Sequence, residues 1–269
     1  MRSIADQSEA ELGGRLSVLR LQRRDHMRLD ELLACLSEAP PLEQRKVLLH
    51  IYRLVFPHAF AEEAVLWPAI RRVVPNGEQL TLQVEREHQQ INELVMLLET
   101  MEPAHPERPQ LIDEVVLLLG QDVGDEETAL LPGLQAQLSI KQLRALGVAW
   151  EVVRRIAPTR PHPFVSRRPP GNVLAALPLA LFDRSRDAID VRRYDASGAA
   201  TPTLDALSAG LRRLSHWVER LPALGVGEDL STARNGHTRI KGVALLGGMA
   251  LAAAMVMTGL RRRAAEQPA

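Results

Sequence analysis

Two segments of the chain carry the same polar and apolar pattern 64 residues apart. His58 to Pro68 reads HAFAEEAVLWP and Asp122 to Pro132 reads DVGDEETALLP, so each has a Glu-Glu pair, an apolar run and a proline. Two further segments, which begin at Asp25-His26 and Glu87-His88, match each other at an offset of 62 residues. Internal repeats of this kind indicate that the chain is built from two equivalent halves.

The polar residues of these repeats fall on helix faces that are otherwise apolar. His26 lies on the stripe of Leu19 and Leu29, and Glu62 follows His58 by one helical turn. A lone histidine on such a face is usually a core residue with a hydrogen-bond partner. Here, however, ionisable residues recur on the apolar faces of all four predicted helices, which argues against that interpretation. Buried carboxylates need compensating charge, which two carboxylate-bridged metal ions would supply. The converging groups are His26, His58, Glu62, His88, Asp122 and Glu126.

Four long amphipathic segments must position these residues. Prolines or a Pro-Asn-Gly turn separate them, and short connections between long helices are typical of an antiparallel four-helix bundle. We therefore predict an all-α protein with this bundle at residues 8–138. The predicted helices span 8–38, 42–74, 78–101 and 110–138. Further along, we expect a capping helix within 139–157, a Pro-rich linker with a short apolar segment at 158–203, and a basic amphipathic region at 204–241.

The repeated motifs resemble the hemerythrin-like HHE cation-binding domain. The matching patterns are D-H-x-x-L-x-x-L-L, H-A-F-A-E-E-A-V-L-W-P, E-H-x-x-I-x-x-L-V and D-V-G-D-E-E-T-A-L-L-P, and they cover roughly residues 10–138. The prolines after Arg160 are similar to the extension that follows this domain in actinobacterial members. The resemblance implies a non-haem di-iron centre in which two glutamates bridge the ions.

Carried over by position, the resemblance implies that His26, His58, Glu62, His88 and Glu126 are metal ligands. Asp122 stands where the family has a histidine. Aspartate is a legitimate ligand for iron or manganese, so three histidines and three carboxylates remain a plausible dinuclear set. The additional negative charge should favour the higher oxidation state and weaken reversible dioxygen binding, and loss of the metal is the alternative. Residues that could hydrogen-bond the ligands are His50, Glu63 and Glu127.

Two classes of function follow from such a centre. The protein could bind or sense dioxygen or nitric oxide, or it could be an enzyme that decomposes peroxide or nitric oxide. A third interpretation is a metal-free helical scaffold at a membrane. No nucleophile triad, phosphate loop or cofactor fingerprint is recognisable, so we assign no catalytic residue.

The formal net charge of zero conceals two oppositely charged halves. Residues 1–139 contain 13 Lys and Arg against 23 Asp and Glu, and the remainder contains 20 against 10. An acidic half, and a basic half without interleaved aromatics, argue against nucleic acid as a partner. Cys35 is the only cysteine, which excludes a disulfide framework, and we expect a buried thiol. Four histidines remain unassigned: His105, His162, His216 and His237.

Residues 242–260 contain no charged residue and are flanked by basic ones. As a helix this stretch would measure about 28 Å, close to the thickness of a bilayer core. We predict a transmembrane anchor that holds the bundle at the cytoplasmic face, with a cytoplasmic protein and a soluble helix as the alternative. The small-residue spacing of Ala244, Gly248 and Ala252 could support a homodimer.

Overall fold

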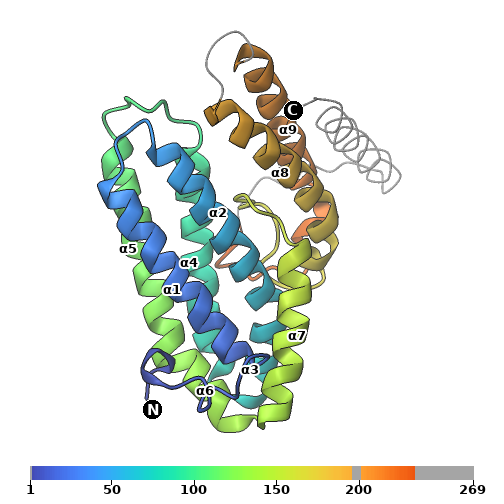
Figure 1. Cartoon of the computed structure of the whole chain (residues 1–269). Helices are drawn as coiled ribbons and strands as arrows, with labels where there is room; N and C mark the ends of the chain where they lie inside the picture. The colour runs from blue at the N-terminus through green and yellow to red at the C-terminus, as the bar shows by residue number, and fades with distance from the viewer. Residues whose placement is uncertain (1, 196–200, 234–269) are drawn as a thin grey trace, which may run out of the picture.

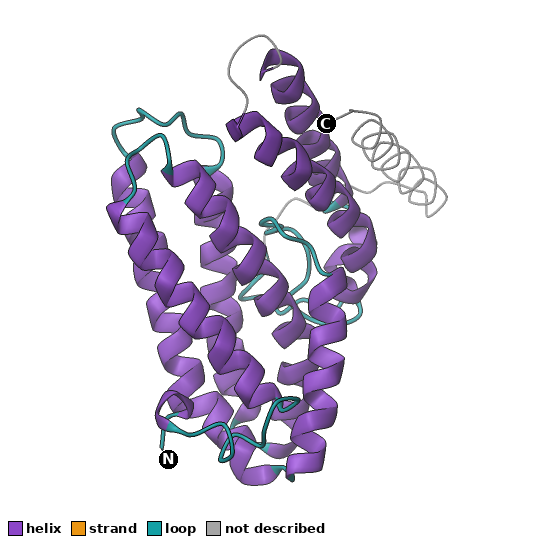
Figure 2. Ribbon diagram, viewed as in Figure 1, coloured by secondary structure: helices purple, strands orange, loops and turns teal. Residues whose placement is uncertain are grey.

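The computed structural model describes residues 2–195 and 201–233, and within them every regular element is a helix (Figures 1 and 2). Four antiparallel columns form the bundle, which confirms the predicted fold class. The first column is α1 (Val18–Glu38) and the third is α4 (Gly77–Leu98). The second column joins α2 (Gln44–Ala61), a π-helical turn (Glu62–Leu66) and α3 (Trp67–Val73), and the fourth joins α5 (Arg108–Asp125), a second π-helical turn (Glu126–Leu130) and α6 (Leu131–Gln137).

The two π-helical turns reproduce the sequence repeat in three dimensions. Each begins at the first glutamate of a Glu-Glu pair, and the N–H groups of Trp67 and Leu131 donate to the carbonyl oxygens of Glu62 and Glu126, five residues back. A proline follows directly in both columns. Because π-turns are rare and concentrate at functional sites, their repetition here points to the glutamates.

A single polar layer divides the bundle core into two apolar clusters. One cluster contains Leu19, Leu66, Val84 and Leu130, and the other contains Leu29, Phe56, Ile91 and Leu119. Along every column the candidate ligands lie between a residue of one cluster and a residue of the other. The apolar clusters thus hold the four columns together on both sides of the polar residues.

Local chemistry explains where the helices differ from the predictions. The first helix begins at Val18 and not at residue 8, because Gly13 and Gly14 adopt positive φ angles of 91° and 82° that interrupt a helix. Asn76 supplies the left-handed residue of the predicted turn before α4. Cys35 is exposed, contrary to the expectation, because its neighbours Leu32 and Leu36 occupy the buried face of α1.

Helix α7 (Ile140–Ile156) lies along the side of α1 and α2 and does not cap an end of the bundle (Figure 1). Its start is stabilised by a capping box between Ser139 and Gln142. Helix α7 can approach the backbone before α1 closely because residue 147 is a glycine. A Cβ atom at Gly147 would clash with the carbonyl oxygen of Leu16. This position brings Trp150 against the polar layer.

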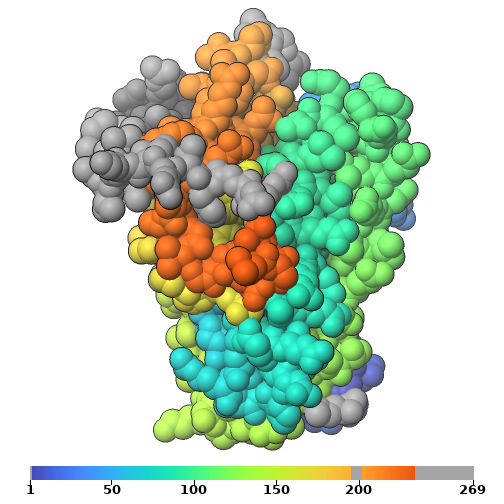
Figure 3. Space-filling view, turned by 180° about the vertical axis from the view of Figure 1, so that it is seen from behind, coloured from blue at the N-terminus to red at the C-terminus, as the bar shows by residue number. Residues whose placement is uncertain are grey.

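The Pro-rich stretch after α7 is irregular, as predicted, but it is buried and does not behave as an exposed linker. His162 and Val165 are 5% and 4% exposed. The stretch lies between α4 and a helical pair formed by α8 (Gly171–Asp195) and α9 (Thr201–Val218), and the short apolar segment expected there belongs to α8. Figure 3 shows α9 and the residues after it against α4. We call residues 158–233 the extension.

The predicted membrane anchor at 242–260, with its small-residue stripe, lies outside the described residues and stays a prediction. None of the helices that the structure describes combines the length and the apolar character that crossing a membrane requires.

Candidate metal centre

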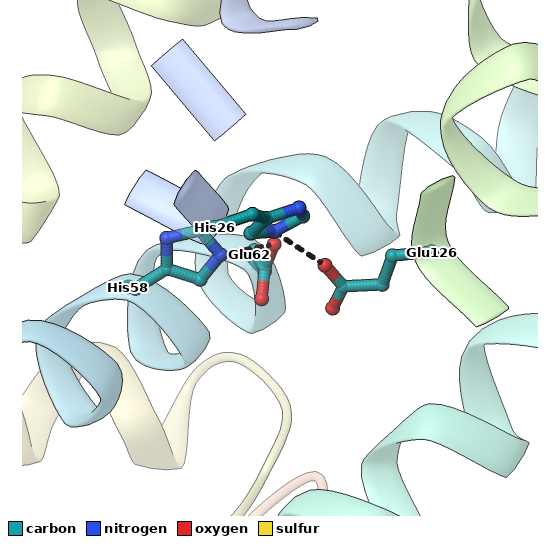
Figure 4. Close-up of side chains that lie close together, drawn as sticks. All are labelled: His26, His58, Glu62 and Glu126. Atoms are coloured by element: carbon teal, nitrogen blue, oxygen red, sulfur yellow. Dashed lines mark ion pairs between the residues drawn. The ribbon is translucent and has the colours of Figure 1, made fainter. Parts of the chain in front are cut away.

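The structure brings the six predicted ligands together in the polar layer. One atom from each of His26, His58, Glu62 and Glu126 lies within 4.8 Å of the others, and a second group joins Glu126 to His88 and Asp122. Figure 4 shows the first four side chains pointing toward one another from three columns. None of the six residues is more than 9% exposed.

Both glutamates face histidines of both groups, as bridging ligands must. Glu126 places Oε2 3.2 Å from Nε2 of His26 and Oε1 3.9 Å from Nε2 of His88. Glu62 places Oε1 3.0 Å from Nε2 of His58 and Oε2 3.9 Å from Nε2 of His88. Asp122 completes the second group, with Oδ1 3.3 Å from Nε2 of His88.

The donor atoms that face the centre lack hydrogen-bond partners although they are buried. They are Nε2 of His26 and His88, both carboxylate oxygens of Glu62, Oδ1 of Asp122 and Oε1 of Glu126. Buried polar atoms are nearly always satisfied, because an unsatisfied one costs about 1–3 kcal/mol. Imidazole and carboxylate donors of this kind suit iron or manganese. The residues therefore fit a dinuclear metal centre.

Each ligand histidine is oriented from its other ring nitrogen by a carboxylate. Nδ1 of His26 lies 2.9 Å from Glu127, and Nδ1 of His88 lies 2.9 Å from Glu63. Nδ1 of His58 lies 3.5 Å from Asp25. Such partners fix the ring and its tautomer, so that Nε2 is free to bind a metal.

Glu63 and Glu127 thus lie where the sequence placed them, but His50 does not. His50 is exposed on α2 and contacts no ligand. Eight residues along a helix turn the side chain about 80° away from the face of His58, which explains the error. Asp25 orients His58 instead, and the signal for it in the sequence was the pair of an acidic residue and a histidine that occurs at Asp25-His26 and again at Glu87-His88.

Histidines of one half of the bundle contact glutamates of the other half. His26 of the first half meets Glu126 and Glu127 of the second, and His88 of the second half meets Glu62 and Glu63 of the first. The symmetry breaks at one position, where Asp122 replaces the counterpart of His58.

Glu87 is the counterpart of Asp25 in the second half, and the replacement leaves it without a histidine to hold. Its Oε2 atom is buried and has no hydrogen-bond partner. Burial and the nearby Asp122 raise the pKa of Glu87. The second half therefore keeps the supporting carboxylate after losing the imidazole that it would support.

The ionisation of the cluster without metal follows from these contacts. Burial alone lowers the pKa of a histidine, but the facing carboxylates outweigh it. Glu126 raises the pKa of His26 to about 9, and Glu62 raises that of His58 to about 10. Protonated imidazoles therefore balance the buried carboxylates, and a metal ion has to displace those protons.

Aromatic and basic residues that sequence reasoning missed enclose the cluster. The ring of Trp67 stacks on His88 with centroids 6.3 Å apart, and Trp150 meets His58 edge-on at 5.3 Å. Arg154 lies 3.4 Å from Asp25, and Arg167 of the extension lies 3.5 Å from Glu63. Both helix α7 and the extension therefore contact carboxylates that orient ligand histidines.

Comparison with known proteins agrees with this geometry. Residues 17–134 match the family described as the hemerythrin HHE cation binding domain, so the bundle is a hemerythrin-like HHE domain. An uncharacterized hemerythrin-like protein of Schizosaccharomyces pombe is 25% identical over 134 residues, which are 49% of this chain and 66% of that protein. No solved structure matches the chain.

Proposed function

We propose that the bundle holds two iron ions at a carboxylate-bridged, non-haem centre and binds or senses dioxygen or nitric oxide. The observation that carries the proposal is the set of buried donor atoms without hydrogen-bond partners, shared between two groups through Glu126. Iron bound there would supply an open coordination position for a small ligand. A metal-free scaffold would leave these atoms in buried ion pairs without hydrogen bonds.

A small cavity beside the ligands supports a diatomic molecule as the bound species. It measures about 20 Å³ and adjoins His26, His58, Asp122 and Glu126. A water molecule needs about 10–15 Å³, so the free space beside these side chains is small and favours a small ligand such as a diatomic molecule. The apolar part of its lining, which keeps bulk water away, comprises Leu29, Leu54, Val55, Ala59, Leu119 and Val123.

Decomposition of peroxide or nitric oxide is the second candidate, and Asp122 is the observation that favours it. With Asp122 in the second group, three of the six ligands are carboxylates. The added negative charge stabilises oxidised iron, which suits turnover better than reversible binding. Peroxide consumption by iron-loaded protein distinguishes the two functions.

The cavity offers a direct test of ligand binding. Val123→Leu adds one methylene group to the lining, whereas Val116→Leu makes the same change elsewhere on α5. We expect Val123→Leu to keep both metal ions and to weaken nitric oxide binding by about tenfold, an effect of about 1.4 kcal/mol. The optical spectrum of the iron-loaded protein during titration measures the affinity. Equal affinities for the two variants would reject the cavity as the ligand site.

A further inference from the structure

A second cavity lies away from the metal ligands, between the bundle and the extension. It measures about 270 Å³ and is lined by residues of α2, the end of α4, the start of α5, and helices α8 and α9. Ligand pockets usually measure about 300–1,000 Å³, so this one lies just below that range and has room only for a small molecule. None of the six candidate metal ligands contributes to its lining.

Arginines dominate the lining of this cavity. Six of them line it together with four carboxylates, and a fifth carboxylate, that of Asp187, pairs with Arg160 at 2.7 Å from outside the lining. The arginines are Arg45, Arg108, Arg160, Arg186, Arg193 and Arg212. Two come from the bundle and four from the extension, so the cavity exists only when the extension is docked.

Three of the arginines form ion pairs with most of the carboxylates in the lining. Arg160 lies 2.7 Å from Glu99 and 2.8 Å from Asp190, and Arg186 lies 2.9 Å from Glu99. Arg193 pairs with Asp190 at 3.5 Å and also contacts Asp205. These pairs form the wall that joins the extension to α4.

Arg108 and Arg212 have no carboxylate within ion-pair distance among the residues that the structure describes. Arg108 is only 4% exposed, donates to the carbonyl oxygen of Leu98 at 3.2 Å, and has a buried Nε without a partner. Arg212 contacts only the carbonyl oxygen of Glu99, at 3.4 Å. Burying an uncompensated guanidinium is costly, so an anion in the cavity would stabilise both.

The surroundings of these two arginines agree with an anion site. Burial and the neighbouring Arg45 lower the pKa of Arg108, and burial and Arg186 lower that of Arg212. Leu48, Tyr52 and Leu98 add apolar surface to the lining beside these arginines.

We propose that this cavity binds a small phosphomonoester, with its phosphate group between Arg108 and Arg212. A phosphomonoester carries a charge of about −1.5 to −2 at neutral pH, which would balance the two guanidinium groups that have no carboxylate within ion-pair distance. Guanidinium groups bind phosphate through pairs of parallel hydrogen bonds, and Arg108, which lines the cavity, has an Nε atom without a partner. The organic part of the ligand would contact Tyr52 and its apolar neighbours.

Calorimetric titration of the full chain with glycerol 2-phosphate and inorganic phosphate, in phosphate-free buffer of low ionic strength, tests the proposal. We expect saturable binding of one ligand per chain that weakens as salt is added. Arg212→Gln and Arg108→Gln should each weaken binding by about tenfold or more. Arg72→Gln, an exposed change on α3 that does not line the cavity, should leave binding unchanged.

The design separates loss of the site from loss of the fold. Arg212 is half-buried and makes a single backbone contact, so Arg212→Gln should unfold at the temperature of the original chain even if Arg108→Gln does not fold. Absence of saturable binding would overturn the proposal. Unchanged binding by folded Arg212→Gln would do so as well, as would tighter binding of succinate than of glycerol 2-phosphate.

Discussion

Replacement of Glu126 by alanine should remove one metal ion and weaken the other. Glu126 is the one ligand that belongs to both groups. Without it, the first group keeps His26, His58 and Glu62, whereas the second keeps His88 and Asp122 and can only share Glu62 with the first. Three ligands are the number found in open metal sites, so the second ion, which has two ligands of its own, should be the one that is lost.

The size of the effect can be bounded from the contacts. Loss of a residue that merely orients a ligand typically costs 10–100-fold in metal affinity, so loss of a shared ligand should exceed about 100-fold, or about 2.7 kcal/mol. Removal of Glu126 also takes one of two carboxylate partners from the protonated His26, so the metal-free variant should be less stable than the original chain by about 1–3 kcal/mol.

Metal analysis after anaerobic iron loading measures the outcome. We expect two iron ions per chain in the original protein and in Glu114→Ala, an exposed change on α5, against about one in Glu126→Ala. Thermal unfolding of the metal-free proteins provides the stability comparison. Two tightly held ions in Glu126→Ala would refute the bridging assignment.

Three further predictions concern residues around the centre and the extension. Asp122→His gives Glu87 an imidazole to hold and should tighten the weaker metal position by about tenfold in a chelator competition, whereas Asp113→His at an exposed site should not. Glu63→Gln and Glu127→Gln should each weaken metal binding by about 10–100-fold in the same assay, and full affinity would mean that neither orients a ligand. Burial lowers the pKa of His162, but Asp183 and Glu219 outweigh it and raise the pKa to about 10. Because the unfolded value is about 6.5, the stabilisation by His162 is complete below that pH and is lost as the pH rises to about 10, so urea unfolding should show a decline that His162→Gln lacks.

Local pattern and repetition made the bundle and its polar layer predictable. The six candidate ligands occur at helical spacing on apolar faces, and the two halves confirm each other, so one sequence was enough to place them in a common layer. The π-helical turns were not predicted, since no residue type marks such a turn. Their positions coincide with the Glu-Glu pairs, which is visible only once the backbone is known.

Contacts between distant segments escaped prediction. His162 was left unassigned because no carboxylate lies near it in sequence, yet it meets Asp183 and Glu219, which are 21 and 57 residues away. Arg160 similarly meets Glu99 across 61 residues. Such pairs depend on how the extension folds back onto α4, and no periodic pattern encodes that.

The crosswise pairing has a consequence for how a centre of this kind can be assembled. Neither helical hairpin contains a complete site, because the histidines at the start of each hairpin face glutamates near the end of the other. A chain that carried only one hairpin could build the centre only by joining a second copy of itself about a two-fold axis. In the present chain the two hairpins are covalently linked, so their sequences can differ. The second hairpin has Asp122 at the position where the first has His58.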